Sequence, residues 1–531
     1  MPVDREREAL DEMGATEVSV PIAGVVVAAF LVLTLVPGLA HLVRSPGPLV
    51  EKGAAIPMAL VAKPTRPFEA SRDTLQAIDG FEGELRNGSP LAAWVRPRVQ
   101  GVFYDAAGVG NVQVVVGQDA PDTERSGPVL YFRPSVRHAM GEPFLDPERH
   151  DRVRRGGPAW ESPPEPDPRP AVRQLADDLA MHGVELMVVP VPVKATVDHE
   201  PLGLAVPVDN PSWAPFREHL QRLGVDGPDA LSVLQELEAP RFLETDTHWR
   251  PEAMDAVAAS VARSLRERGV EGGRPLRRGE PVEHSAAGDL VDLLGMAEGK
   301  VAPDTVSVAP LQRRPDRADA SVLVLGDSFA GIYEDPTLGF GDDGGFPDAL
   351  AAHLGAPVDA LVVNAGGAWQ ARQALADQVE RLEHVDVVVW LFTARELSVG
   401  DWREVRLPVG AVEVDPRFVA LDPGETRTLT GRIAAIAPAA DPQGSPYPDQ
   451  LVAVSVTVDG RAPGSPGSEA WGYAWGLRER QPQPAASARV GQSVTLQASS
   501  FADAPPQALP AGRSEAPGRP AAVPLLWLEW P

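Results

Sequence analysis

The chain has 531 residues, among them 48 Lys and Arg, 74 Asp and Glu and no cysteine, so its formal net charge is −26. A negative charge of this size argues against a protein that coats nucleic acid or clamps onto anionic lipid through a basic face. The lack of cysteine excludes disulfides, thiolate nucleophiles and cysteine-bound zinc. At roughly 100–200 residues per domain, the length predicts two to four domains.

The N-terminal region contains a long apolar stretch. Residues 18–43 hold no Asp, Glu, Lys or Arg, and about 20 apolar residues suffice for a helix to cross a bilayer. We therefore predict a tail at 1–17, a transmembrane anchor at 18–43 and a stalk at 44–110. A cleaved signal peptide with its cleavage site near residues 38–40 is the alternative. Basic residues are balanced on the two sides of the stretch, so the positive-inside rule leaves the orientation open.

Residues 111–403 alternate between helical and strand patterns. Their apolar runs lack a regular polar alternation, as expected of strands buried on both faces, and amphipathic helices lie between them. This order predicts an α/β fold with a parallel sheet, whose functional groups gather beyond the carboxyl ends of the strands. The expected central strands, with the turns that follow them, are 184–193, 321–328, 358–367 and 385–392, and the clearest helices are 171–183 and 251–269.

Residues 404–531 lose the helical signal and read as a separate all-β domain. One run in this region alternates cleanly and ends in Asp-Gly, which is typical of a hairpin turn. Trp471, Tyr473 and Trp475 alternate with small residues and therefore share one face of a strand. Aromatic rings stack on sugars, so this face is a candidate carbohydrate-binding surface. The alternative is that it forms the core of the domain.

Ser328 is the first candidate for chemistry. It follows an apolar strand in the sequence Gly-Asp-Ser-Phe at 326–329, and a serine on a tight turn after a strand projects its hydroxyl at the carboxyl edge of the sheet. Backbone N–H groups at such a turn can hold an oxyanion. The alternative is an ordinary turn in which Asp327 caps a helix.

His248 is the histidine best suited to activate that serine. It lies in Asp-Thr-His-Trp at 246–249, and in an extended segment residues two apart face the same way, so Asp246 can reach the imidazole. A carboxylate there orients the imidazole and stabilises its charged form. The alternative is an incidental histidine next to a helix cap. A strand-end serine together with a separate Asp-x-His is the pattern expected for acyl transfer.

These motifs together resemble the SGNH-hydrolase-like alginate O-acetyltransferases of the AlgJ/AlgX type. The resemblance rests on the two motifs above and on a strand ending VVWLFTAREL at 388–397, and it covers roughly residues 90–403. Ordinary SGNH hydrolases place the serine near the start and Asp-x-x-His near the end. Here Asp-x-His precedes the serine, as in the O-acetyltransferase branch. The resemblance implies an SGNH-like (flavodoxin-like) sheet for the catalytic domain at 111–403.

The resemblance also implies roles for individual residues. Ser328 is the expected nucleophile that carries the acetyl group, His248 the general base and acid, and Asp246 its orienting partner. The Ser328 backbone N–H is the first candidate for the oxyanion hole, and Arg395 either binds an acidic sugar or pairs with Glu396. The further candidates for oxyanion or substrate binding lie in the turn after a strand and are Asn364, Gly366 and Gly367.

The function implied is that of a membrane-anchored enzyme that O-acetylates a cell-surface or secreted polysaccharide. We expect neither metal nor cofactor, because the family implies an acetyl donor relayed by a multipass membrane-bound O-acyltransferase. It also implies a single-pass inner-membrane protein with its catalytic part in the periplasm or cell exterior. Two alternatives stay open, a carbohydrate acetyl-esterase with the same triad and a non-catalytic polysaccharide-binding protein.

Overall fold

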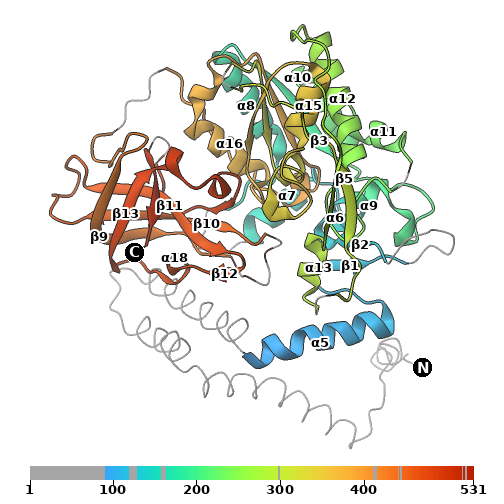
Figure 1. The fold of residues 1–531 in the computed structure, drawn as a ribbon, viewed down its shortest axis with the longest axis horizontal. Helices are drawn as coiled ribbons and strands as arrows, with labels where there is room; N and C mark the ends of the chain where they lie inside the picture. The colour runs from blue at the N-terminus through green and yellow to red at the C-terminus, as the bar shows by residue number, and fades with distance from the viewer. Residues whose placement is uncertain are drawn as a thin grey trace, which may run out of the picture. The chain divides into compact units, whose positions relative to one another are not determined.

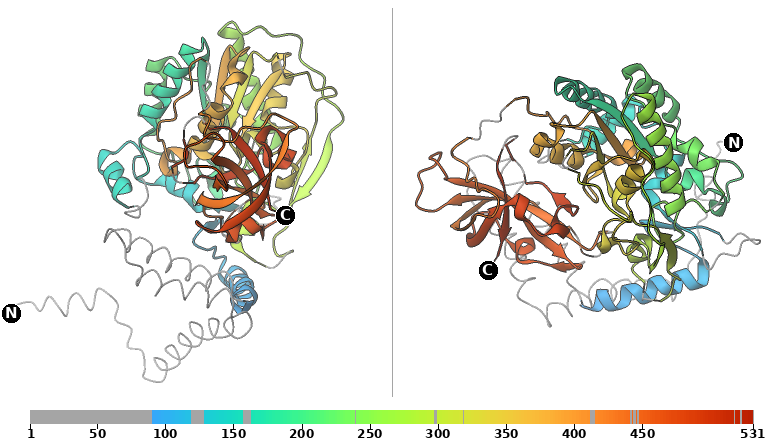
Figure 2. Two further views of the ribbon diagram at one scale, coloured as in Figure 1. Left: turned by 90° about the vertical axis from the view of Figure 1, so that its left-hand side faces the viewer. Right: turned by 45° about the horizontal axis from the view of Figure 1, so that its top comes forward.

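The structure is a computed structural model of the chain. It describes residues 90–118, 128–156, 163–238, 240–296, 299–317, 319–410, 415–440, 442, 445, 447–516, 518–520 and 523–530. Residues 100–531 form one compact unit. Figures 1 and 2 show its two parts, an α/β part and a body of C-terminal strands coloured orange to red.

A four-stranded parallel sheet lies at the centre of the α/β part. Its strands are almost wholly buried because they are continuous runs of valine, leucine and other apolar residues. The strand order is β3-β8-β6-β7 and every neighbouring pair is parallel, so the predicted parallel α/β sheet is confirmed. The strands are β3 (Glu185–Val191), β6 (Val322–Gly326), β7 (Val358–Val362) and β8 (Val387–Thr393).

Helices cover both faces of this sheet. Alternate residues of a strand point to opposite faces, and the buried residues accordingly form two separate clusters. One cluster joins Val189, Val324 and Val389 to α12 (Pro251–Glu267) and α15 (Phe346–Leu354). The other joins the alternate strand residues to α8 (Pro168–Met181), α10 (Trp213–Leu223) and α16 (Gly367–Asp377).

Shorter elements surround the sheet. Two antiparallel strand pairs are β1 (Val114–Val116) with β2 (Leu130–Phe132), and β4 (Val282–Ala286) with β5 (Asp304–Val308). The remaining helices of the α/β part are α6 (Arg133–Met140), α7 (Pro147–Gly156), α9 (Lys194–Val197), α11 (Ala230–Gln235), α13 (Asp289–Leu294), α14 (Ser328–Gly331) and α17 (Glu396–Val399).

The C-terminal strands form the predicted all-β domain around a third apolar cluster, which starts at Phe418. Strand β10 pairs with both β9 and β11, and β15 and β13 complete the circuit, so five strands close into a ring. Closure leaves few unpaired strand edges. The strands are β9 (Thr426–Ile436), β10 (Gln450–Val458), β11 (Glu469–Arg478), β12 (Gln481–Pro482), β13 (Ser493–Ser500), β14 (Gly512–Ser514) and β15 (Leu525–Glu529), with a short helix α18 (Pro484–Ser487).

The predicted tail at 1–17 and anchor at 18–43 lie outside the described residues, as does the stalk as far as residue 89. The rest of the predicted stalk contains helix α5 (Pro90–Ala107). Among the helices that the structure describes, none combines the length and the apolar character needed to cross a bilayer.

Candidate active site

Ser328 begins helix α14 directly after strand β6. The carboxylate of Asp327 fixes this turn, because one oxygen accepts from the N–H of Phe329 at 2.9 Å and the other from the N–H of Thr393 at 3.0 Å. A Cβ on Gly326 would lie only 2.7 Å from the Cβ of Ala330, so the turn requires glycine. The cap by Asp327, which the sequence offered as the alternative, is therefore present, and it positions Ser328 at the carboxyl edge of the sheet.

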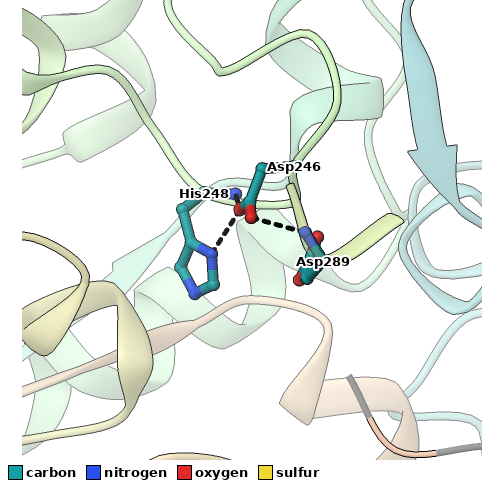
Figure 3. Close-up of side chains that lie close together, drawn as sticks. All are labelled: Asp246, His248 and Asp289. Atoms are coloured by element: carbon teal, nitrogen blue, oxygen red, sulfur yellow. Dashed lines mark hydrogen bonds and ion pairs between the residues drawn. The ribbon is translucent and has the colours of Figure 1, made fainter. Parts of the chain in front are cut away.

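Asp246 and His248 contact each other through a bend. We predicted an extended segment, but residues 244–248 bend, because one oxygen of Asp246 accepts from the backbone N–H of His248 at 2.8 Å. The same oxygen lies 2.6 Å from His248 Nδ1. Since a carboxylate only accepts, Nδ1 carries the proton and donates it in this hydrogen bond. Figure 3 shows the carboxylate of Asp246 facing the imidazole of His248.

The imidazole reaches the serine on its other side. His248 Nε2 lies 2.8 Å from Ser328 Oγ, within the hydrogen-bond range that an activated nucleophile needs. Both residues are only 1% exposed. The three residues that the sequence singled out therefore form one continuous chain of hydrogen bonds. His248 and Ser328 make contact although they lie 80 positions apart in the sequence.

The Asp246–His248 pair favours the charged imidazole. Burial lowers the pKa of His248, but the charge and hydrogen bond of Asp246 outweigh it and raise the pKa above its ordinary value. Burial acts in the opposite direction on Asp246, and the charge and hydrogen bond of His248 again prevail and lower its pKa. This arrangement stabilises the imidazolium that forms when His248 takes a proton from Ser328.

Asp289, at the start of α13, holds the Asp246–His248 segment through hydrogen bonds. The sequence analysis did not predict this residue. Its backbone N–H donates to the second oxygen of Asp246 at 2.8 Å, and its carboxylate accepts from the N–H of Thr247 at 2.9 Å. Burial and the charge of Asp246 raise the pKa of Asp289 to about 7. Asp246, His248 and Asp289 offer ligand atoms within 4.8 Å of one another and could surround a cation, but hydrogen bonds already engage both oxygens of Asp246.

Lys194, just beyond the carboxyl end of β3, holds the backbone of the Asp246 segment. The residue is 4% exposed, and the three N–H groups of its ammonium are shared among four carbonyl oxygens at 2.5–3.2 Å. Burial lowers its pKa to about 8, so it carries charge at neutral pH. The four carbonyls belong to Leu130, Leu243, Glu244 and Asp246.

Replacing Lys194 with methionine is expected to lower the free energy of unfolding by about 3 kcal/mol, because buried carbonyls lose their donor. Activity is expected to fall as well, since the Asp246 segment loses its support. Urea denaturation measures the first effect. Lys300→Met is the control, because Lys300 is 44% exposed in its ion pair with Asp105 and its loss should cost less than about 0.5 kcal/mol. Equal stability of the two variants would contradict the role given to Lys194.

Asn364 lies just beyond the carboxyl end of β7, and two of its three N–H groups have partners other than Ser328. Its side-chain amide donates to Asp335 at 2.6 Å and its backbone N–H donates to the carbonyl of Pro510 at 2.7 Å. The backbone N–H is therefore used, because the β-domain loop at Pro510 packs on this turn, and so is one of the two N–H groups of the side-chain amide. The second amide N–H of Asn364 remains a candidate donor to an oxyanion.

The other candidates of this group are Gly366, Gly367 and Arg395, and the last two lie next to Glu396. Gly366 donates its N–H to the carbonyl of Val363 at 3.0 Å, and a Cβ on Gly367 would lie 2.5 Å from Glu396 Oε2. Arg395 lies beyond the carboxyl end of β8, with its Nε 3.8 Å from the carboxylate of Glu396. Of the two roles left open for Arg395, the ion pair with Glu396 is thus present.

A cavity of about 210 Å³ opens beside the imidazole. It receives residues from both parts of the unit, since Tyr447 and Arg480 belong to the β-domain. Tyr447 also contacts the nucleophile, with its hydroxyl 2.7 Å from Ser328 Oγ. No sequence signal marked this tyrosine, which lies in a loop rich in proline. The residues that line the cavity include Asp246, His248, Leu338, Gly339, Tyr447 and Arg480.

The aromatic stripe of β11 belongs to the interior of the β-domain. Trp471 is 5% exposed and Tyr473 is 1% exposed, and Trp475 packs against the same cluster. The rings of Trp471 and Tyr473 are too buried to stack on a sugar, whereas Trp475 is partly buried. The placement therefore agrees with the alternative in which these residues form the domain core, and the proposed carbohydrate surface is not found at this stripe.

Comparison with known families identifies the α/β part. A family model described as "SGNH hydrolase-like domain, acetyltransferase AlgX" matches residues 157–394, which contain both the Asp-x-His segment and the strand-end serine. Residues 157–394, which are less than half of the chain, thus match the AlgX acetyltransferase family. The predicted AlgJ/AlgX-type resemblance is confirmed for this stretch, and we refer to it as the AlgX-type domain.

Curated relatives of the AlgX-type domain include two named "Probable alginate O-acetylase AlgJ". The one from Pseudomonas putida is 30% identical over 108 residues, which is 20% of this chain and 28% of the relative. The one from Pseudomonas aeruginosa is 30% identical over 114 residues, which is 19% of this chain and 29% of the relative. The chain thus spans less than a third of the length of the curated relatives that it matches.

Solved structures give looser overlaps. The O-acetyltransferase domain of Pseudomonas putida AlgJ is 20% identical with a TM-score of 0.40, covering 54% of this chain and 92% of that one. Pseudomonas aeruginosa AlgX is 14% identical with a TM-score of 0.39, covering 74% and 92%. These overlaps are too loose to support an inference about the site.

Proposed function

We propose that this chain is a membrane-anchored polysaccharide O-acetyltransferase that carries the acetyl group on Ser328. The observation that carries the proposal is the hydrogen-bond chain from Asp246 through His248 to Ser328 in the AlgX-type domain. The names of the curated relatives support a polysaccharide hydroxyl as the acceptor.

In the first half of the proposed reaction, Ser328 Oγ attacks the carbonyl carbon of an acetyl donor. The hydroxyl proton of Ser328 passes to His248 Nε2, and Asp246 stabilises the resulting imidazolium. The tetrahedral intermediate then collapses. The bond to the donor's leaving group breaks, and the leaving group takes the proton from Nε2. The product is an acetyl ester of Ser328.

In the second half, a sugar hydroxyl replaces the leaving group. It gives its proton to His248 Nε2 and attacks the ester, after which Ser328 Oγ departs and takes that proton back. Burial of the site favours transfer over hydrolysis, because Ser328 and His248 are each 1% exposed and a closed site excludes water. A sugar that fills the cavity would displace the remaining water.

The proposal includes the location of the enzyme. Residues 18–43 would anchor it in the inner membrane, with the AlgX-type domain in the periplasm or cell exterior. The acetyl donor would be delivered by a multipass membrane-bound O-acyltransferase, so the chain itself would need neither cofactor nor metal. A span of about 20 apolar residues is long enough for such an anchor.

Acetyl transfer can be tested on the full chain in detergent with 4-nitrophenyl acetate as the donor and an alginate oligosaccharide as the acceptor. We expect acetylated oligosaccharide by mass spectrometry, and faster release of nitrophenolate when the acceptor is present. Release of acetate with no acetylated sugar would instead identify an acetyl-esterase. No turnover with either substrate would favour a binding protein.

A further inference from the structure

Tyr447 is the one residue of the β-domain that the described structure brings into hydrogen-bond contact with the nucleophile. It lies in the connection between β9 and β10, is 7% exposed, and has its hydroxyl 2.7 Å from Ser328 Oγ. We propose that Tyr447 is a catalytic residue, which the β-domain supplies to hold the oxyanion of the acyl-transfer reaction. This inference rests on the proposed function and assigns the β-domain a part in its chemistry.

The direction of the hydrogen bonds follows from the protonation of the imidazole. His248 Nδ1 carries a proton because it faces the carboxylate of Asp246, so Nε2 of the neutral ring accepts from Ser328. The single hydroxyl proton of Ser328 is then used, and Tyr447 must donate to Oγ. Burial raises the pKa of Tyr447, so its hydroxyl stays protonated and remains a donor at neutral pH.

A donor in this position changes partner as the reaction proceeds. When Oγ forms its bond to the acetyl carbon, it becomes an ester oxygen and accepts hydrogen bonds poorly. The carbonyl oxygen on that same carbon gains negative charge, and the Tyr447 hydroxyl can donate to it after a small shift. Tyr447 keeps its proton throughout, so it stabilises the charge without entering the proton transfer between Ser328 and His248.

The oxyanion of the reaction needs more than one hydrogen-bond donor. The backbone N–H of Ser328, at the start of α14, is one candidate. In the turn 364–367, which we predicted as the second, the backbone N–H of Asn364 already donates to Pro510 and one of its two amide N–H groups donates to Asp335. Tyr447 is the further donor that the described structure brings against the reacting oxygen.

The Tyr447 loop is held by the turn between β11 and β12. The backbone N–H of Arg480 donates to the carbonyl of Pro448 at 2.9 Å, and its guanidinium donates to the carbonyl of Ser445 at 2.8 Å. The same guanidinium pairs with Asp292 of α13 at 2.5 Å. Arg480 therefore ties the Tyr447 loop to the helix that carries Asp289.

This turn is built at a conformational cost. Glu479 and Arg480 have φ values of 50° and 60°, a left-handed conformation that is strained for a non-glycine residue. Two-residue hairpin turns of this kind ordinarily use Asn-Gly or Gly-Gly. Arg480 is thus a positioning residue. Glycine would adopt this backbone conformation with less strain, but it would lack the side chain that holds the Tyr447 loop.

The test is Tyr447→Phe in the full chain, with the burst of nitrophenolate from 4-nitrophenyl acetate as the rate of Ser328 acylation. Loss of one oxyanion donor lowers the rate about 10²- to 10³-fold. We expect this loss in the rate constant of the burst at saturating donor, with little change in the donor concentration that half-saturates it. Tyr473→Phe is the matched control, since Tyr473 is a buried tyrosine of the same domain whose hydroxyl pairs with Glu515. It should acylate at the wild-type rate.

Arg480→Gln provides a second test that separates positioning from general stability. If Arg480 acts through Tyr447, its loss lowers acylation in the wild-type background but adds nothing in the Tyr447→Phe background. Additive losses in the double variant would contradict that coupling.

Three outcomes bear on the inference as a whole. If Tyr447→Phe is acylated at the wild-type rate, the catalytic role of Tyr447 is overturned, but the proposed function is unaffected. Equal losses in Tyr447→Phe and Tyr473→Phe would overturn that role too, because the effect would then be one of domain stability. Absence of a burst from the wild-type chain would refute the proposed function, and the inference would fall with it.

Discussion

Replacing Ser328 with alanine is expected to abolish acyl-enzyme formation, with a loss in kcat of roughly 10⁶-fold. The reason is that Ser328 Oγ is the atom that bonds to the acetyl carbon, so no other group can substitute for it. The fold should survive. The buried Tyr447 hydroxyl loses its partner, which costs about 1–3 kcal/mol of the free energy of unfolding.

The measurement is the nitrophenolate burst, together with a thermal unfolding curve for each variant. Ser455→Ala is the matched control, because Ser455 is 4% exposed and lies in β10, remote in sequence from the AlgX-type domain. We expect the control to keep the burst. A burst of wild-type size from Ser328→Ala would show that the nucleophile is another residue.

Replacing Asp246 with asparagine is expected to lower kcat by about 10⁴-fold. An asparagine side chain can donate to His248 Nδ1, which would move the ring proton to Nε2 and remove the base that Ser328 needs. An amide nitrogen that faces Nδ1 takes the position of the oxygen that accepts from the backbone N–H of His248, so the bend loses that hydrogen bond. A thermal unfolding curve checks that the fold persists.

The same substitution should move the pH dependence of kcat/KM. His248 must be neutral to accept the proton of Ser328, so activity rises as pH increases through the pKa of His248. Because Asp246 raises that pKa, the acidic limb of the wild-type profile should lie above pH 6.5, the ordinary histidine value. In Asp246→Asn the limb should move to lower pH.

Asp348→Asn is the control for this shift. Asp348 is another buried aspartate, and its carboxylate pairs with Arg314 and Arg317 rather than with a histidine. Its profile should coincide with that of the wild type. An acidic limb that stays in place in Asp246→Asn would mean that the Asp246 charge does not act on the catalytic base.

The sheet and both motifs could be predicted because their signals are local. The apolar composition of a strand such as Val322–Gly326 is enough to predict it, and Ser328 follows this strand within two residues. The Asp-x-His spacing likewise joins Asp246 and His248 within one short segment. Its conformation was predicted wrongly as extended, because side-chain bonds to the backbone, which bend the segment, have no simple periodic pattern.

Contacts between distant segments could not be predicted. Tyr447 meets Ser328 across 119 residues, and only the packing of the closed β-ring brings it there. Lys194 depends in the same way on four carbonyls from two remote segments. The turn at Asn364 was predicted as part of the oxyanion hole, but its backbone N–H donates to the β-domain loop and its side-chain amide donates to Asp335.

The most direct measurement is the position of the acetyl group on the protein. The full chain is mixed with 4-nitrophenyl acetate, quenched in acid within the burst and digested, and the peptides are sequenced by mass spectrometry. We predict one acetyl group, on Ser328, that disappears when oligosaccharide is added before the quench. Acetylation only at lysine or at another hydroxyl would contradict the role of Ser328 as the acetyl carrier.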